Sequence, residues 1–203
     1  MLNKTSKMSK VGMILLLLAA VFTAASAFVP VWRIDLTAPQ YPEGLQLFIG
    51  GLSGISGNLD SINDLNHYVG MAKIFPEDFW EFKALPVILF VFAVLFLLSA
   101  IARSKKMTLG SFILFCIFGV LGFVDFYYWT YSYGHNLSPD APIKVPGMAY
   151  QPPVFGYKKL ANFEAFSVPD MGGYLLFASG FLIALAVFYE FGIIDKLFKR
   201  KKA

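Results

Sequence analysis

Residues 84–102 read ALPVILFVFAVLFLLSAIA, and the short polar link RSKKMT joins them to a second apolar run that begins at Leu109. A helix that crosses a bilayer needs about 20 consecutive, predominantly apolar residues. The stretch from Val87 to Ala102 meets this need and carries no charge. Because the link between the two runs is short, the sequence predicts a tight helical hairpin inside a membrane.

Two further apolar stretches flank this hairpin in a chain of 203 residues that is 57% hydrophobic. We therefore predict an integral membrane protein of one domain, mainly α-helical, with four transmembrane helices and a small extracytoplasmic cap. The cap is expected to combine short strands, short helices and a proline-rich loop. The predicted spans are about 11–32, 84–102, 109–131 and 171–194, and the outer segments are 33–83 and 134–170.

The first apolar stretch has two interpretations. Lysines precede it and Ala25-Ser26-Ala27 lies near its end, which is typical of a cleaved secretory signal peptide. The apolar run nevertheless continues through Trp32, so it is long enough to span a bilayer. We interpret it as an uncleaved signal anchor that ends at an interfacial Trp32, with cleavage as the alternative.

The charge distribution predicts the orientation, since Lys and Arg collect in cytoplasmic loops. With the N-terminus in the cytoplasm, 11 of the 17 basic residues lie inside, whereas the outer segments hold six basic and ten acidic residues. The net charge of +4 thus reflects topology and does not indicate nucleic-acid binding. We expect a bacterial inner-membrane protein with both termini in the cytoplasm and its main loops on the periplasmic face.

Local patterns predict the structure of the first outer segment. Leu45–Ile49 alternates like a strand, and the glycine-rich residues 50–57 indicate the turn of a small hairpin. Asp60 or Ser61 is placed to cap a following helix. Pro76 then predicts the start of another helix, whose residues 79–82 form an aromatic belt at the membrane interface.

The second outer segment is rich in prolines and therefore cannot be a regular helix. Its aromatic residues favour a defined surface loop over a disordered one. We expect this loop to pack over the outer mouth of the helices against the first outer segment.

The stretch from Asp60 to Met71 carries the first candidate site. If it is helical throughout, Asp64, His67 and Met71 share one face, because residues three and four apart are neighbours on a helix. Imidazole and thioether together suit copper, and thioether favours Cu(I). The alternative is that His67 and Met71 simply pack against a neighbouring element.

Three more residues could complete such a site on the outer side. His135 is the other histidine of the chain and shares the proline-rich loop with Met148, while Met171 begins the last span. Whether these residues meet His67 and Met71 depends on the fold.

Asp125 and Glu190 are carboxylates within predicted spans, where charged groups are costly and are functional candidates by default. Asp125 lies near the outer end, where its alternatives are a transport role and contact with water. Glu190 lies near the inner end, where Lys196 or the backbone offers a partner. The single cysteine, Cys116, is interpreted as a packing residue.

Motifs of phosphate, dinucleotide, nucleophilic or zinc enzymes do not occur in the sequence. The glycine-rich residues 50–57 lack the lysine and the following helix that a phosphate-binding loop needs. We therefore expect a protein that is not an enzyme.

Two groups of residues, one in each outer segment, resemble a known family. Residues 38–45 and 65–71, together with residues 141–153, 162–166 and 169–173, resemble small bacterial inner-membrane proteins that accompany nitrous-oxide-reductase maturation. The resemblance covers the outer segments and not the spans. It implies copper handling on the outer side beside a copper enzyme, and it brings no catalytic residues with it.

These observations lead to one expected function and two alternatives. We expect a membrane accessory protein that binds or passes copper on the extracytoplasmic side, with a copper enzyme or its assembly factors as partner and His67 and Met71 as first ligands. The alternatives are a metal-free structural subunit of a membrane complex and a small-solute transporter that uses Asp125 or Glu190.

Overall fold

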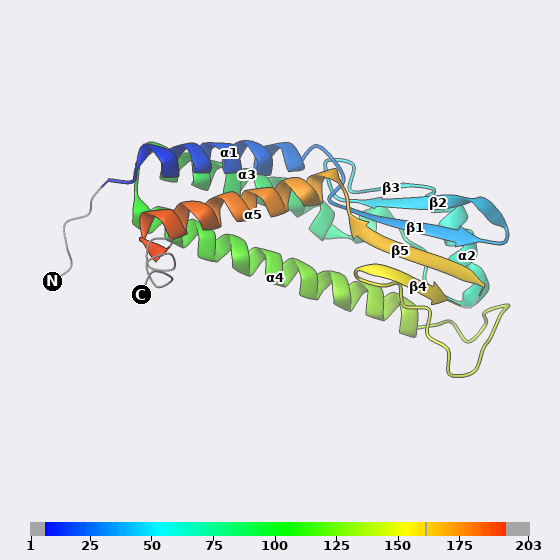
Figure 1. Ribbon diagram of the computed structural model, residues 1–203. Coiled ribbons are helices and arrows are strands. Elements are labelled where there is room, and N and C mark those ends of the chain that lie inside the picture. Colours follow the sequence, from blue (N-terminus) through cyan, green and yellow to red (C-terminus); the bar gives the residue numbers. More distant parts are fainter. Residues whose placement is uncertain (1–6, 161, 194–203) are drawn as a thin grey trace.

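The structure, a computed structural model, describes residues 7–160 and 162–193 and is elongated (Figure 1). Four helices lie side by side at one end, and a β-sheet domain with one further helix occupies the other end. Chain segments from both outer parts of the sequence build the sheet domain. The helices of the bundle are α1 (Lys10–Ser26), α3 (Trp80–Ile101), α4 (Lys105–His135) and α5 (Met171–Glu190).

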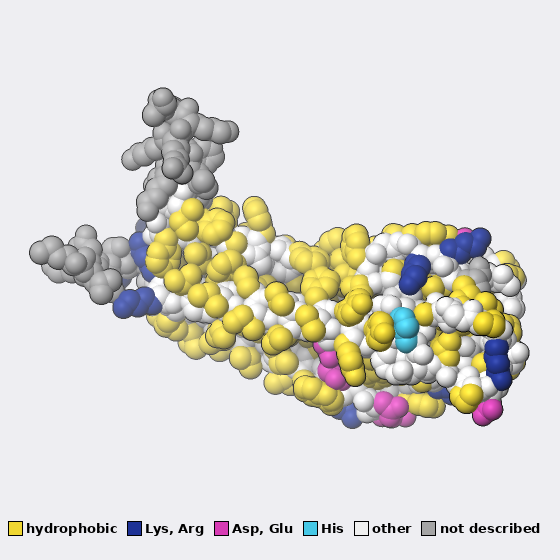
Figure 2. Space-filling view, turned by 90° about the horizontal axis from the view of Figure 1, so that it is seen from below, with side chains coloured by type: hydrophobic (Ala, Val, Ile, Leu, Met, Phe, Trp, Pro, Cys, Tyr) yellow, Lys and Arg dark blue, Asp and Glu magenta, His cyan; other side chains and the backbone are white. Residues whose placement is uncertain are grey.

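Three of these helices, α3, α4 and α5, are long and apolar enough to cross a membrane, whereas α1 is an apolar helix of 17 residues. Buried side chains between α1, α3 and α5 form one apolar core, whose fully buried members include Leu16, Phe96 and Ile183. On the face that Figure 2 shows, hydrophobic side chains make up much of the surface of this part, and basic side chains lie at its far end. The chain therefore combines helices of membrane composition with a sheet, and this mixed class was only partly predicted.

Helix α1 ends at Ser26, six residues before the predicted end of the first span. The chain continues through Pro30, and Trp32 is already the first residue of β1 (Trp32–Ala38). The Trp32 side chain is buried and its Nε1 donates a hydrogen bond to Ser167 Oγ at 2.8 Å. The prediction of an interfacial Trp32 at the end of a span was therefore wrong, because an indole with a buried partner packs as core.

The sheet has five antiparallel strands in the order β3-β2-β1-β5-β4 (Figure 1). Strand β1 is central, and Ile34 lies opposite Leu47 on one side and Ser167 on the other. The two outer segments thus share one sheet, which the sequence did not predict. The other strands are β2 (Tyr41–Ile49), β3 (Ile55–Gly57), β4 (Gly156–Leu160) and β5 (Phe163–Pro169).

The structure confirms the predicted strand at Leu45–Ile49 and its hairpin, since β2 turns through glycines into β3. It also contains the predicted helix around His67, namely α2 (Leu59–Val69). The predicted cap residues are wrong, because α2 begins after Asn58, whose Oδ1 accepts from Gln46 N at 2.8 Å instead.

One face of the sheet is covered by α2 and by the outer end of α4. Ile34, Leu47 and Ile62 are at most 3% exposed and belong to one apolar cluster there. After α2 the chain forms a single 3-10 turn (Pro76–Asp78), which replaces the predicted helix start. Phe79, predicted in the aromatic belt, is instead buried in the same cluster.

Candidate metal site

The position of the first candidate ligands follows from the amphipathic pattern of α2. Ile62, Asn66 and Val69 are buried, so they define the face that lies on the sheet domain. Asp64 and His67 fall on the other side and are exposed. Since a helix places residues three and four apart on one face, the burial pattern leaves the His67 imidazole at the surface.

Helix α2 ends before Met71. Gly70 adopts a left-handed conformation with φ 81°, and its N–H donates to His67 O at 3.3 Å. The Met71 N–H then donates to Asn66 O at 2.9 Å, which completes a glycine C-cap. The prediction that Asp64, His67 and Met71 share one helical face was therefore wrong, because the chain has left the helix when it reaches Met71.

Two asparagines hold the segment that follows. Asn63 Oδ1 accepts from Ile74 N at 2.7 Å, and its Nδ2 donates to Ile74 O at 3.0 Å. Asn66 Nδ2 donates to Ala72 O at 3.2 Å. These amides give hydrogen-bond partners to the backbone of Ala72 and Ile74, and they hold the segment after Met71 against α2. Sequence reasoning missed both residues, although an asparagine's paired donor and acceptor is well suited to such a role.

The loop that follows α4 is joined to the end of α2. Ser138 N donates to Gly70 O at 2.7 Å, and Ile143 N donates to Tyr68 O at 2.9 Å. A Cβ at Gly70 would lie 2.8 Å from Ala141 Cβ, so the loop approaches α2 as closely as a glycine permits. The structure thus brings together the two segments that contain the candidate ligands.

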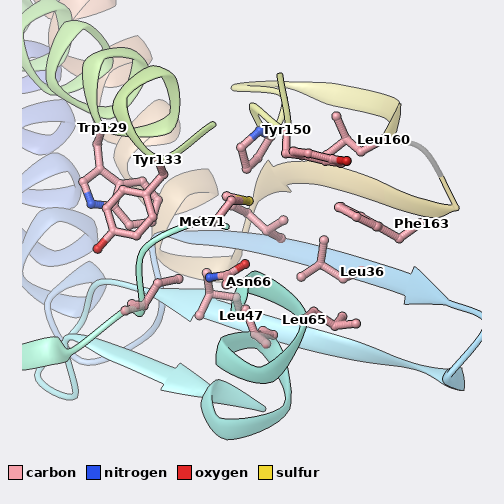
Figure 3. A pocket seen from close by; sticks show the side chains of 14 residues that line it. Leu36, Leu47, Leu65, Asn66, Met71, Trp129, Tyr133, Tyr150, Leu160 and Phe163 are labelled. Atoms are coloured by element: carbon pink, nitrogen blue, oxygen red, sulfur yellow. The ribbon is translucent and has the colours of Figure 1, made fainter. Parts of the chain in front are cut away.

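Two of the three outer candidate methionines pack on one apolar cluster. Met71 and Met148 both pack against the buried group Val69, Tyr150, Leu160 and Ala165. Met71 also lines a small cavity of about 40 Å³ between the sheet, α2 and the end of α4 (Figure 3). This cavity has room for a few water molecules, but cavities with an apolar lining stay dry. Its lining is overwhelmingly apolar, so Met71 also has an ordinary packing role.

The histidines occupy a different environment. Both His67 and His135 are exposed, and neither lines the cavity. His135, the last residue of α4, has its Nδ1 at 2.9 Å from Tyr131 O and stacks on the Tyr131 ring at a centroid distance of 3.9 Å. Because a carbonyl oxygen only accepts, Nδ1 carries the proton, and in the neutral ring Nε2 keeps a free lone pair.

Met171 lies apart from α2, at the junction of β5 and α5, and is 60% exposed. Within residues 7–160 and 162–193 there is no group of three His, Cys, Asp or Glu side chains that could hold a metal ion. The structure therefore packs Met71 and Met148 against the same buried group, and it leaves both imidazoles at the surface.

The two carboxylates of the helices differ in their surroundings. Asp125 lies exposed on α4. The Glu190 side chain is 3% exposed, accepts hydrogen bonds from Ser9 N at 2.9 Å and from Ser9 Oγ, and pairs with Lys105 Nζ at 3.2 Å. Lys196, the partner expected for Glu190, lies outside the described residues. The observed contacts join the beginning of α1, the beginning of α4 and the end of α5.

No protein family model, curated protein or solved structure matches the chain.

Proposed function

We propose that this protein is a non-enzymatic membrane accessory protein that binds copper on its outer face and passes it to a copper enzyme. In this proposal α1, α3, α4 and α5 span the bacterial inner membrane, both termini are cytoplasmic, and the sheet domain is periplasmic. The apolar surface of the helices and the basic residues at their inner end support this placement. The resemblance of the outer segments to proteins of nitrous-oxide-reductase maturation supports copper as the bound metal.

The observation that carries the proposal is the hydrogen bond between His135 Nδ1 and Tyr131 O. Metal-binding histidines almost always donate their second ring N–H to a carbonyl or carboxylate, which fixes the tautomer and the ring orientation. His135 has this arrangement and is exposed, so its Nε2 is available for coordination. A site that hands its metal to another protein needs such an accessible ligand.

The available donors fit copper better than other metals. Imidazole nitrogen and thioether sulfur are the ligands that suit Cu(I), whereas calcium and magnesium require oxygen. His135 and His67 would supply nitrogen, and Met148 and Met71 would supply sulfur from the segments that meet at Gly70. Met171 is more remote from this junction.

A metal-free structural subunit of a larger membrane complex is the second candidate. It is favoured by the packing of Met71 and Met148 in an apolar cluster, where flexible thioethers commonly fill gaps. It is also favoured by α4, which leaves most of its apolar side chains uncovered. In this candidate, His67 and His135 have no metal ligand role.

Copper binding to the purified full chain in lipid nanodiscs separates the two candidates. A chromophoric Cu(I) chelator would compete with wild type and with His135→Ala, Met148→Leu and Met71→Leu, each of which should weaken binding. Met107→Leu is the matched control, because Met107 is exposed at the opposite end of the molecule. Leucine conserves most of the methionine volume, so the metal-free stability should change by less than about 1.5 kcal/mol.

Copper should also raise the thermal midpoint of wild type, because a ligand that binds only the folded state stabilises it. A wild type that neither competes with the chelator nor gains thermal stability would contradict the copper proposal and leave the structural subunit. Equal affinity in wild type and all four variants would show that copper binds elsewhere.

The orientation is tested separately by cysteine labelling from outside the cell. In a Cys116→Ser background, a membrane-impermeant maleimide should modify Ser138→Cys on the outer loop and spare Lys106→Cys at the start of α4. Both positions are exposed in the fold: Ser138 carries an exposed side chain after α4, and Lys106 carries one beside the α3–α4 link. The reverse pattern would contradict the proposed topology and remove the compartment that copper transfer requires.

A further inference from the structure

The glycine-rich turn between β2 and β3, residues 50–54, contributes no ligand to the proposed copper site. Gly50, Gly51 and Gly54 all have positive φ values, 95°, 70° and 68°, so the chain needs glycine at each of these positions. The turn closes on itself, because Gly50 N donates to Gly54 O at 2.6 Å. Between these glycines stands one large apolar residue, Leu52, which is 63% exposed.

Close contacts place this turn at the level where the helices end. A Cβ at Gly51 would lie 2.9 Å from Val29 O, three residues beyond the end of α1, and a Cβ at Gly54 would lie 3.4 Å from Phe82 Cβ in the first turn of α3. The turn is therefore held between the outer ends of two bundle helices. Figure 1 shows the connection of β2 and β3 beside the beginning of α3.

Exposed apolar side chains continue from the helices onto this turn. Phe28, two residues after α1, is 61% exposed, and Trp80 at the start of α3 is 69% exposed. Phe28 contacts Phe90 on the outer face of α3, edge to face, at a centroid distance of 5.7 Å. Leu52 thus extends the apolar surface of the helices onto the sheet domain, at the level where Trp and other amphipathic residues anchor proteins to the membrane interface.

We infer that the Gly50–Gly54 turn inserts into the membrane, at the boundary between the headgroups and the acyl chains of the outer leaflet. The inference rests on the membrane placement of the proposed function and is independent of copper. Insertion of Leu52 removes its side chain from water at little entropic cost, because the turn is already fixed by its contacts with Val29 and Phe82. Together with α1 and α3, the turn would hold the sheet domain at a fixed tilt on the bilayer.

The test uses the full chain in phosphatidylcholine nanodiscs, in a Cys116→Ser background, with an environment-sensitive fluorophore on Leu52→Cys. Lipids that carry a doxyl quencher close to the headgroup should quench this probe several-fold more than a probe on Thr37→Cys. Thr37 is the matched control, because it is exposed at the opposite end of β1 in the same sheet. Iodide in the aqueous phase should show the opposite order.

A third probe on Val94→Cys separates this inference from the membrane placement itself. Val94 lies on the outer face of α3 and is 52% exposed, so a deep doxyl lipid should quench it if α3 spans the bilayer. Lipid quenching at Val94 without lipid quenching at Leu52 would overturn the inserted turn and leave the spanning helices intact. Absence of lipid quenching at both positions would overturn the membrane placement and the inference together.

Protection of the Leu52 probe from both lipid and iodide would also overturn the inference, because it would show that a protein surface covers the turn.

Discussion

The side chain of Asn63 forms two hydrogen bonds with the backbone of Ile74, one through Oδ1 at 2.7 Å and one through Nδ2 at 3.0 Å. The two hydrogen bonds resemble those between two paired residues of an antiparallel sheet, with the Asn63 side chain in place of the second strand. It holds Ile74, three residues after Met71, against α2. Ile74 is 5% exposed, so water does not readily replace either bond.

Substitution Asn63→Ala should therefore lower the free energy of unfolding by about 1–3 kcal/mol, since it leaves buried backbone groups unpaired. Equilibrium unfolding in mixed detergent micelles, followed by tryptophan fluorescence, measures the change. Asn136→Ala is the control, because Asn136 is exposed and bonds only to Ser132 Oγ through its side chain. A surface change of this kind costs within about 0.5 kcal/mol. Equal effects of the two substitutions would contradict the bridging role of Asn63.

The junction between α2 and the outer loop should be sensitive to a single methyl group. Gly70 and Gly147 have similar left-handed backbones, with φ 81° and 75°. Alanine in this conformation costs about 1–2 kcal/mol at either position. Only at Gly70 would the new Cβ meet another side chain, at 2.8 Å from Ala141 Cβ, whereas the space around Gly147 is open.

Gly70→Ala should thus destabilise the protein clearly more than Gly147→Ala in the same unfolding experiment. Trypsin cleavage after Lys144 gives a second measurement, because loss of the contact with α2 should expose the loop and accelerate cleavage in Gly70→Ala alone. If the two variants lose equal stability and are cleaved at equal rates, the close approach of the loop to α2 does not contribute to folding.

Patterns of local origin were read correctly from the sequence. The apolar run of α3, the strand Leu45–Ile49 and the helix around His67 each depend on neighbouring residues. Strand β1 was missed because Trp32 continues the apolar run of α1, so the strand looks like the end of a span. Strand β5 was missed because its pairing with β1 joins residues more than one hundred positions apart. Strand β4 pairs with β5 in a local hairpin, and it was missed because the prolines of this segment favour a loop.

In the candidate site too, local features could be predicted from the sequence and long-range contacts could not. His67 and Met71 were singled out by a spacing that holds only if the helix continues, and Gly70 ends it. A glycine one residue before Met71 is a standard stop signal and could have predicted this. The packing of Met71 and Met148 against the same buried group depends on the sheet that unites the two outer segments, and short-range spacing does not contain that information.

The end of the helix bundle that lies far from the sheet should depend on the Glu190 carboxylate. Glu190→Gln keeps the size of the side chain but removes the charge that accepts from Ser9 and pairs with Lys105. Hydrogen bonds to charged groups contribute about 1.5–3 kcal/mol, so the substitution should lower the free energy of unfolding by an amount of this order. Glu77→Gln, at an exposed position in the 3-10 turn, is the control and should change stability within about 0.5 kcal/mol.

A transport role for Glu190 predicts a different result. A variant that folds with unchanged stability, while an ion flux into proteoliposomes is lost, would contradict the structural role of this carboxylate. Lys105→Met should reproduce the loss of stability if the Glu190–Lys105 pair is what holds the ends of α4 and α5 together.

The hydrogen bond between Trp32 Nε1 and Ser167 Oγ, at 2.8 Å, joins the two outer segments inside the sheet and is best measured by a double-mutant cycle. Ser167→Ala strands the buried indole N–H and also removes the bond from Ser167 Oγ to Val154 O. Trp32→Phe removes the N–H and some of the contact with Phe126.

Each single substitution should destabilise the protein. The double variant should lose less than the sum, with a coupling of about 0.5–3 kcal/mol, because no indole N–H is then left unpaired. Strictly additive losses would mean that the pair contributes no energy of its own, and that the first and second outer segments are held together by apolar packing and the backbone ladder alone.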